Sequence, residues 1–171
     1  MKKANGMYFF FTERDVFSNW YPCNFEADGK KYQHMEKYMM ERKALLFGDT
    51  DMAEKIMASN SPSTAKAMGR RVRGYTDNLW HAHREEIVFQ GLLAKFSSNE
   101  ELKAILLSTE NYPLVEASPY DAVWGIKLPM THPDSLDPKK WRGLNLLGKA
   151  LVKTREALQP KPTSALKLRL K

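Results

Sequence analysis

The sequence predicts a mainly α (α+β) fold, built as a single compact domain with one or two minor strands. The chain has 171 residues, of which 43% are hydrophobic, enough for one core and not obviously for two. Helical segments with capping residues follow one another through most of the chain, and only two short runs are typical of strands. We expect the domain over residues 5–159 and a basic, flexible tail over residues 160–171.

The first expected strand is the aromatic run Met7–Phe11. Residues 12–33 form a long loop rich in turn residues, in which Asp28-Gly29 predicts a short hairpin. A helix is then expected over His34–Phe47, where Gly48 ends it. Long structured loops in compact domains are often functional, so residues 12–33 are a candidate part of the site.

Three more helices are predicted in succession. One covers Asp51–Ser59. The next begins after Ser61, which is a good N-cap, with proline at the first helical position, and runs to about Arg71. The longest spans Asp77–Phe96.

The last third of the chain is less regular. Ser98–Glu101 has the pattern of a capping box and predicts a helix that ends at Leu107. Tyr112–Ala117 is expected to be a short strand, and Ser118–Lys140 a loop because four prolines interrupt it. A final amphipathic helix is predicted over Leu144–Leu158.

The charge balance favours an anionic ligand. Net charge is +7, and residues 161–171 contribute four cations and no acid, so the rest of the chain carries 7 − 4 = +3. Such an excess suits a phosphorylated or polyanionic ligand, although a solvated basic surface explains it equally well.

The chain has the features of a cytoplasmic protein. Cys23 is the single cysteine, so no intrachain disulfide can form, which fits a reducing compartment. No apolar run approaches the roughly 18 residues of a membrane span, and no signal-peptide pattern opens the chain. We therefore expect no membrane partner.

Glu36 and Lys43 are the most informative pair of residues. They lie seven positions apart in an otherwise apolar helix, which places both on one stripe, roughly 10 Å apart along the axis. A helix this apolar is expected to be packed on several sides, where charges are costly unless they are paired or used. A structural ion network is the alternative interpretation.

Other segments combine aromatic side chains with carboxylates or amides, a combination that suits a planar base and ribose hydroxyls. They are Phe17–Pro22, Lys95-Phe96, Glu116–Gly125 and Trp141–Gly148. Structural alternatives remain open for each: Trp20, Trp124 and Trp141 as core residues, Asp121 as the cap of a turn, and Asn145 as the N-cap of the final helix.

No metal or cofactor is predicted. The four histidines and one cysteine have no recognised metal-ligand spacing, and the chain lacks a P-loop, a GxGxxG turn and a nucleophile elbow. Arg70, Arg71 and Arg73 could contact phosphates, although cations at a helix end are also typical of a solvated turn.

Glu36–Asp49 resembles the central motif of the NADAR superfamily, which includes the YbiA-like N-glycosidases. Five further segments agree in order and extend the resemblance from about Met7 to Leu158: Phe17–Pro22, Ser61–Arg70, Lys95-Phe96, Leu114–Gly125 and Trp141–Gly148. Lys37 and Ile126-Lys127 depart from the pattern, because relatives often carry Gln or His at the first position and a Gly-rich continuation at the second.

This resemblance implies metal-independent hydrolysis of an N-glycosidic bond. It implies two substrate classes: ribosylamino-pyrimidine and related phosphorylated intermediates of riboflavin synthesis, and ADP-ribose attached to guanine. The expected partner is thus a phosphorylated nucleoside or an ADP-ribosyl small molecule, with ADP-ribosylated nucleic acid as a further one. The resemblance does not decide between these classes.

Roles follow for individual residues. Glu36 is expected to be the carboxylate nearest the ribose, and Asp121 to bind ribose hydroxyls or orient water. Lys43 is expected to attack C1′ and form a Schiff base with the opened sugar, with Lys95 as its rival. The expected substrate-binding residues are Asn19, Trp20, Tyr38, Arg70, Lys95, Trp124 and Asn145.

Two other function classes compete with an enzyme. A binding module would hold ADP-ribose or a nucleotide in the same pocket without cleaving it. A nucleic-acid-binding protein would depend on the basic tail. The pair Glu36 and Lys43 favours the enzyme, because a pure binder has less use for desolvated charges beside a sugar.

Overall fold

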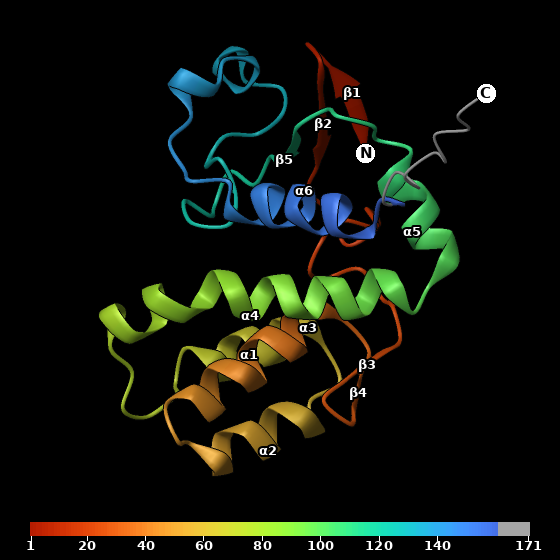
Figure 1. Cartoon of the computed structure of the whole chain (residues 1–171). Helices are drawn as coiled ribbons and strands as arrows, with labels where there is room; N and C mark the ends of the chain where they lie inside the picture. The colour runs from red at the N-terminus through yellow and green to blue at the C-terminus, as the bar shows by residue number, and fades with distance from the viewer. Residues whose placement is uncertain (161–171) are drawn as a thin grey trace, which may run out of the picture.

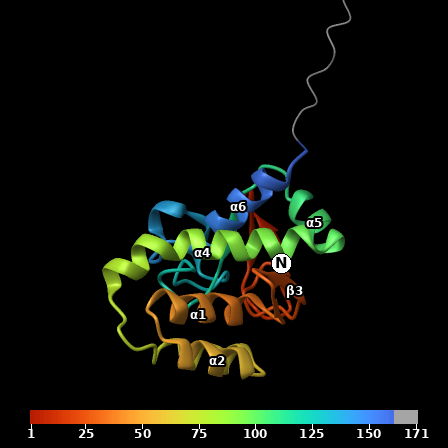
Figure 2. The same cartoon turned by 60° about the horizontal axis from the view of Figure 1, so that its bottom comes forward.

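The computed structural model describes residues 1–160 of the chain. The longest helix, α4 (Asp77–Ser97), crosses the middle of the molecule, with α6 (Leu146–Leu158) on one side and α1 (Met35–Leu46) on the other (Figure 1). A second view shows the same layers (Figure 2). The predicted fold class is confirmed. The predicted tail, except for Pro160, lies outside the described residues.

The larger sheet has three strands in the order β1 (Lys2–Ala4), β2 (Met7–Phe10) and β5 (Leu114–Glu116). The aromatic run and the segment after Tyr112 were expected as strands, but β1 was not. It pairs antiparallel with β2 across an Asn5-Gly6 turn, in which both residues have positive φ values of 46° and 71°. The three residues of β1 are too few to show the alternation typical of a strand. The Asn5-Gly6 dipeptide, which favours a hairpin turn, was the one sequence feature that could have predicted this strand.

Strands β2 and β5 run parallel, with Phe10 opposite Glu116. The chain therefore leaves both strands at the same edge of the sheet, and the two following loops start side by side. Helix α6 packs directly on β5, because a Cβ at Gly148 would come within 1.9 Å of the Leu114 carbonyl oxygen.

The predicted hairpin within residues 12–33 is present. Strands β3 (Phe25–Ala27) and β4 (Lys30–Tyr32) pair antiparallel. Asp28 and Gly29 have φ values of 50° and 73°, as the turn chemistry of this dipeptide requires.

Helix α1 is enclosed on several sides, as its composition predicts. His34 caps it through Nδ1, which accepts from Lys37 N at 3.0 Å. It packs against α2 (Thr50–Ala58), α3 (Pro62–Gly69) and α4. Buried positions cover most of its surface and include Glu36, so a carboxylate on this helix faces protein rather than solvent.

Two local predictions were wrong in detail. Helix α5 (Glu100–Leu107) is capped by Asn99, whose side chain accepts from Leu102 N at 3.2 Å, while Ser98 ends α4. The proline-rich segment is not wholly irregular, because Pro133–Leu136 and Pro138–Lys140 form short 3-10 helices. Proline is tolerated in a first helical turn, where its missing N–H would have no partner.

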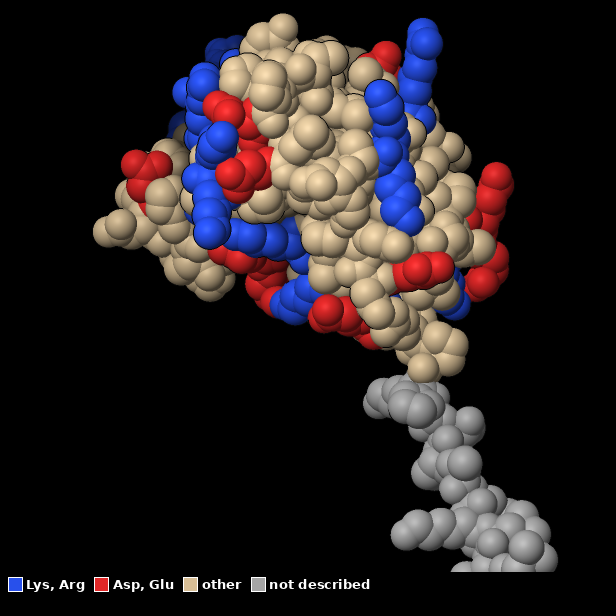
Figure 3. Space-filling model, turned by 90° about the horizontal axis from the view of Figure 1, so that it is seen from above, with Lys and Arg blue, Asp and Glu red and all other residues tan. Residues whose placement is uncertain are grey.

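Within residues 1–160, no helix is long and apolar enough to cross a membrane. Figure 3 shows the face seen from above in Figure 1: blue and red side chains alternate around its edge, and its centre is largely uncharged.

Candidate active site

Two neighbouring cavities open beside the carboxyl ends of β2 and β5. The first, of about 350 Å³, lies among residues of α1, α3 and α4, and we call it the helix cavity. The second, of about 540 Å³, lies between the loops that follow β2 and β5, and we call it the loop cavity. Five side chains line both cavities: Trp20, Lys66, Arg70, Glu116 and Asp121. The two cavities thus share a wall that carries three positive or aromatic groups and two carboxylates.

Glu36 projects from the first turn of α1 into the helix cavity. It is only 3% exposed, and its Oε1 has no hydrogen-bond partner among residues 1–160. Burial raises the pKa of Glu36 to about 7, with Lys66 opposing the rise and Asp121 adding to it. A buried carboxylate oxygen without a partner is costly, so Glu36 is a strong candidate for a group that acts on a ligand.

Glu116 is a second buried carboxylate, and it is not among the catalytic residues predicted from the sequence. It ends β5, and its Oε2 has no hydrogen-bond partner among the described residues. Burial raises the pKa of Glu116 to about 8, and the negative charges of Asp121 and Glu36 add to the rise. One sequence feature could have indicated a role for Glu116 in the site: it lies near the end of a predicted strand, in the same segment as Asp121 and Trp124.

Asp121 joins these carboxylates but also has a structural task. Its Oδ1 accepts from the backbone N–H groups of Val123 and Trp124, each at 2.8 Å. The sequence left open whether Asp121 caps a turn or lines the site, and it does both. The turn orients Trp124 toward the helix cavity.

Positive side chains face the carboxylates. Lys66 of α3 lowers the pKa of both Glu36 and Glu116, although burial outweighs it in each case. Lys43 lies farther along the helix cavity, as its spacing of seven residues from Glu36 predicts. Its Nζ donates to Gly69 O at 2.8 Å and lies 4.3 Å from the centre of the Tyr75 ring. Burial lowers the pKa of Lys43, and Arg70 lowers it further.

The loop predicted to be functional is fixed against α1. Glu36 N donates to Asn19 O at 2.9 Å, and Trp20 N donates to Ser18 Oγ at 3.1 Å. Asn19 is buried, and its Oδ1 has no partner among residues 1–160. It therefore offers an acceptor to a ligand in the helix cavity.

Comparison with protein families decides the identity of this domain: residues 8–159 match the NADAR domain. The chain belongs to the NADAR family. The resemblance that the sequence motifs predicted is thereby confirmed.

Relatives of this NADAR domain include proteins with named activities. The chain is 43% identical over 149 residues to N-glycosidase R617 of Acanthamoeba polyphaga mimivirus, covering 84% of this chain and 88% of that one. It is 33% identical to N-glycosidase YbiA of Escherichia coli strain K12 over 152 residues, covering 88% of this chain and 86% of the other. The NMR structure of E. coli YbiA matches with a TM-score of 0.73 at 31% identity, covering 92% and 87% of the two chains.

A longer plant protein contains a related segment. Over 109 residues the chain is 35% identical to the chloroplastic riboflavin biosynthesis protein PYRR of Arabidopsis thaliana. The match covers 61% of this chain but only 16% of the plant protein.

Seven of the site residues predicted from the sequence line the helix cavity of this NADAR domain: Asn19, Trp20, Glu36, Lys43, Arg70, Asp121 and Trp124. Three do not. Tyr38 packs in the core. The centroid of its ring lies 5.2 Å from that of Tyr32 and 6.1 Å from that of Phe25. An apolar core contact explains this residue without a ligand.

Asn145 also lies away from both cavities. Its Nδ2 donates to Leu114 O at 2.9 Å, and its Oδ1 accepts from Glu116 N at 3.0 Å. It precedes α6, which begins two residues later than predicted, but its side chain makes no capping hydrogen bond. Its amide instead bonds to β5 beside Glu116, so its role in the described structure is to hold that strand.

Lys95 is fully buried and does not line either cavity. Its Nζ donates to Val16 O at 2.7 Å and to Ser18 O at 3.4 Å, and burial lowers its pKa to about 8. Lys95 therefore supports the loop that carries Asn19 and Trp20.

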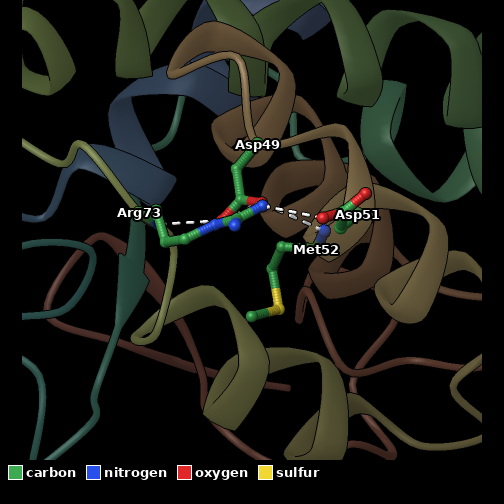
Figure 4. Close-up of polar contacts among 4 residues, drawn as sticks. All are labelled: Asp49, Asp51, Met52 and Arg73. Carbon is green, nitrogen blue, oxygen red and sulfur yellow. Dashed lines mark hydrogen bonds and ion pairs between the residues drawn. The ribbon is translucent and has the colours of Figure 1, made fainter.

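The segment between α3 and α4 brings Arg70 and Tyr75 to the helix cavity, and a carboxylate anchors it. Asp49, which is 2% exposed, accepts from Arg73 N at 2.8 Å, from Nη2 at 2.7 Å and from Nε at 3.1 Å. Figure 4 shows the Arg73 guanidinium between Asp49 and the exposed Asp51. These hydrogen bonds hold the pKa of Asp49 near 2.

We expect Asp49→Asn to lower the melting temperature by several degrees at pH 7 and to raise KM, because the segment with Arg70 loses its anchor. The lowered pKa means that this stabilisation is present above about pH 4 and is lost as the pH falls toward 2. Thermal melts from pH 3 to 7 should therefore show the two proteins converging in acid. Asp51→Asn is the matched control, since that exposed ion pair should contribute little. Equal melting temperatures at pH 7 would contradict the prediction.

Proposed function

We propose that this chain hydrolyses the N-glycosidic bond of a phosphorylated ribosyl compound, with Glu36 and Glu116 as the catalytic carboxylates. The observation that carries the proposal is the pair of buried carboxyl groups with raised pKa values on one cavity. N-glycosidase activity is the class named for R617 and YbiA, which are 43% and 33% identical to this chain over most of its length.

The two carboxyl groups suit opposite roles. Breaking the C1′–N bond builds positive charge on C1′ and the ring oxygen, and it requires a proton for the departing nitrogen. Burial and the negative charges of Asp121 and Glu36 raise the pKa of Glu116, so we assign it the proton that the leaving base receives. Lys66, Trp20 and Arg70 each favour the ionised form of Glu36. We therefore assign it the role of the carboxylate beside the sugar, which stabilises the charge and accepts a proton from water.

The remaining side chains of the cavities suit a phosphorylated nucleoside. Trp20 and Trp124 offer aromatic faces to the leaving base, and Asn19 offers an acceptor to its edge. Arg70 is exposed on the wall that both cavities share and can bind a phosphate. Asp121 completes the site as a partner for ribose hydroxyls.

Hydrolysis through a Lys Schiff base is a finer form of the same proposal. The sequence suggested Lys43 or Lys95 as the amine, and the structure adds Lys66 as a third candidate. We favour Lys66, because it acts electrostatically on both carboxylates and lines both cavities. Lys43 is the alternative, because burial lowers its pKa and so favours the free amine.

The substrate is proposed to be a ribosylamino-pyrimidine phosphate of riboflavin synthesis or ADP-ribosyl-guanine, free or in nucleic acid. The related segment in the riboflavin biosynthesis protein PYRR supports the first class. The two adjoining cavities leave room for the second.

Release of free base, measured by mass spectrometry, tests the function. The panel contains ribosylamino-pyrimidine phosphate, ADP-ribosyl-guanosine and NAD. We expect the wild-type protein to release the base from one of them and to leave the ribose product behind. If no base is released while ADP-ribose still binds, the protein is a binding module rather than an enzyme.

A further inference from the structure

Arg84 is a buried cation in the helix cavity that the proposed reaction does not use. It lies on α4 and is only 9% exposed. Its Nε has no hydrogen-bond partner among residues 1–160. A buried donor of a charged group is costly when no acceptor meets it. Arg84 therefore indicates a ligand that brings an acceptor into this cavity.

The packing of α4 on α1 fixes the place of Arg84 along the cavity. The two helices run in opposite directions: a Cβ at Gly91 would meet Met35, which begins α1, whereas Lys43 Nζ, near the end of α1, lies 5.6 Å from the centre of the Trp80 ring. Arg84 follows Trp80 by one helical turn in the direction of Gly91. It therefore lies between Lys43 and the carboxylates, within reach of a group that is attached to the sugar.

Four unpartnered polar atoms describe the ligand that the helix cavity accepts. Of the seven buried side-chain atoms without a partner in residues 1–160, four belong to residues that line this cavity: Asn19 Oδ1, Glu36 Oε1, Arg84 Nε and Glu116 Oε2. The amide oxygen of Asn19 can only accept a hydrogen bond, and Nε of Arg84 can only donate one. A matching ligand must therefore offer both an N–H donor and an acceptor.

A ring that carries amino and carbonyl groups meets this requirement, whereas a phosphate offers acceptors alone. The side chains around Arg84 also suit a flat ring, because several of them are apolar or aromatic: Met39, Met40, Trp80, Val123 and Trp124. Apolar walls with a few convergent polar groups are typical of a pocket for a planar ligand. The cations Lys66 and Arg70 lie on the wall shared with the loop cavity, so a phosphate has its partners elsewhere.

We propose that Arg84 determines specificity for the leaving base and assists its departure, by donating a hydrogen bond to an exocyclic carbonyl oxygen of that base. This inference rests on the proposed function, because it assumes that the base leaves from a ribose held beside the carboxylates. It names the residue that recognises the base and does not choose between the two proposed substrate classes.

The same contact acts during bond cleavage. As the C1′–N bond breaks, its electron pair passes to the base, which shares the negative charge between the departing nitrogen and the carbonyl oxygen. Arg84 stabilises the charge on that oxygen, and Glu116 supplies the proton that leaves the base neutral. Water adds to C1′ and gives its proton to Glu36.

Arg84→Met separates this role from a structural one. Methionine fills space but offers neither a donor nor a charge. The variant removes a buried guanidinium whose Nε has no partner, so without ligand it should melt no lower than the wild-type protein. The matched control is Arg71→Met, which makes the same change at an exposed arginine that lines neither cavity.

Equilibrium dialysis with free bases gives a readout that does not require turnover. One pair is guanine and the aminopurine that has hydrogen in place of the carbonyl oxygen; the other is a diaminopyrimidinone and the matching diaminopyrimidine. We expect the wild-type protein to bind the carbonyl-bearing member of at least one pair about 10- to 100-fold more tightly, the effect of a hydrogen bond to a charged group. This preference should disappear in Arg84→Met and persist in Arg71→Met.

Turnover gives the second readout. With the substrate that the wild-type protein cleaves, Arg84→Met should lower kcat by about 100-fold, the effect of a lost donor to a developing negative charge. Arg84→Lys keeps the charge but not the planar fork of donors, so it should recover part of this loss.

The outcomes separate the two proposals. If base is released and Arg84→Met keeps both the wild-type kcat and the preference for the carbonyl group, Arg84 does not recognise the base while the N-glycosidase stands. If no substrate is cleaved but the free bases bind with a preference that depends on Arg84, base recognition stands and the proposed function fails. Equal wild-type affinity for both members of each pair overturns the inference without any variant. It is also overturned if Arg84→Met weakens binding of ribose phosphate and leaves base binding unchanged, because Arg84 then holds the phosphate.

Discussion

Glu36→Gln is expected to lower base release at neutral pH by about 100-fold or more, the scale of a lost catalytic carboxylate. Glutamine keeps the shape of the side chain and its place on α1, but it cannot carry the negative charge that stabilises C1′. The measurement is kcat and KM with whichever substrate of the panel the wild-type protein cleaves. We expect the loss mainly in kcat, because the interaction strengthens as charge develops in the transition state.

The pH profile gives the same variant a second readout. Burial raises the pKa of both Glu36 and Glu116, and the two groups interact, so activity of the wild-type protein should rise and then fall with pH near neutrality as the pair loses its first and then its second proton. In Glu36→Gln the rise with pH should disappear, whereas in Glu116→Gln the fall should disappear. Each limb is thus assigned to one carboxyl group by its own variant.

Stability serves as the control. The pKa of Glu36 is raised in the folded state, so its contribution to stability is present in acid and is lost as the pH rises through about 7. At pH 8 the glutamine variant should therefore melt no lower than wild type. A variant that is folded and fully active would show that Glu36 is not the catalytic carboxylate.

Lys66→Arg is expected to abolish a covalent intermediate and to lower turnover by about 100-fold. Arginine keeps the positive charge beside Glu36 and Glu116 but offers no amine that attacks carbon at neutral pH. In the proposed step, Glu36 takes a proton from the Lys66 ammonium, and Nζ then bonds to C1′ while the C1′–N bond to the base breaks and Glu116 protonates the base. Opening of the sugar ring then gives an imine between Lys66 and C1′, which water hydrolyses.

Borohydride added during turnover should reduce this imine and add the mass of the sugar portion of the substrate to a peptide that contains Lys66. The matched control is Lys43→Arg, which should still give the adduct. An adduct on the peptide with Lys43 would transfer the role to that residue. If the wild-type protein turns over without any trapped adduct, water attacks C1′ directly, and Lys66→Arg should then retain most of its activity.

The sequence by itself determined most of the helix and turn boundaries and the family. Capping and turn residues act over a few positions, so Ser61, the Asp28-Gly29 turn and Gly48 predicted element boundaries from neighbouring residues alone. The spacing of Glu36 and Lys43 placed both on one stripe of α1, because helix geometry is fixed within two turns. The ordered motifs gave the family, which the match over residues 8–159 confirms.

Only the tertiary structure decided which polar residues meet. Glu36, Lys66 and Glu116 come from α1, α3 and β5, and no periodicity in the sequence links three separate elements. The parallel pairing of β2 with β5 brings Glu116 and Tyr120 to the site, and that pairing depends on contacts about a hundred residues apart in sequence. The same packing directs Tyr38, Lys95 and Asn145 into the core or onto backbone carbonyls. The type of a polar residue is a local property, whereas its burial and its partners depend on the packing of the whole chain.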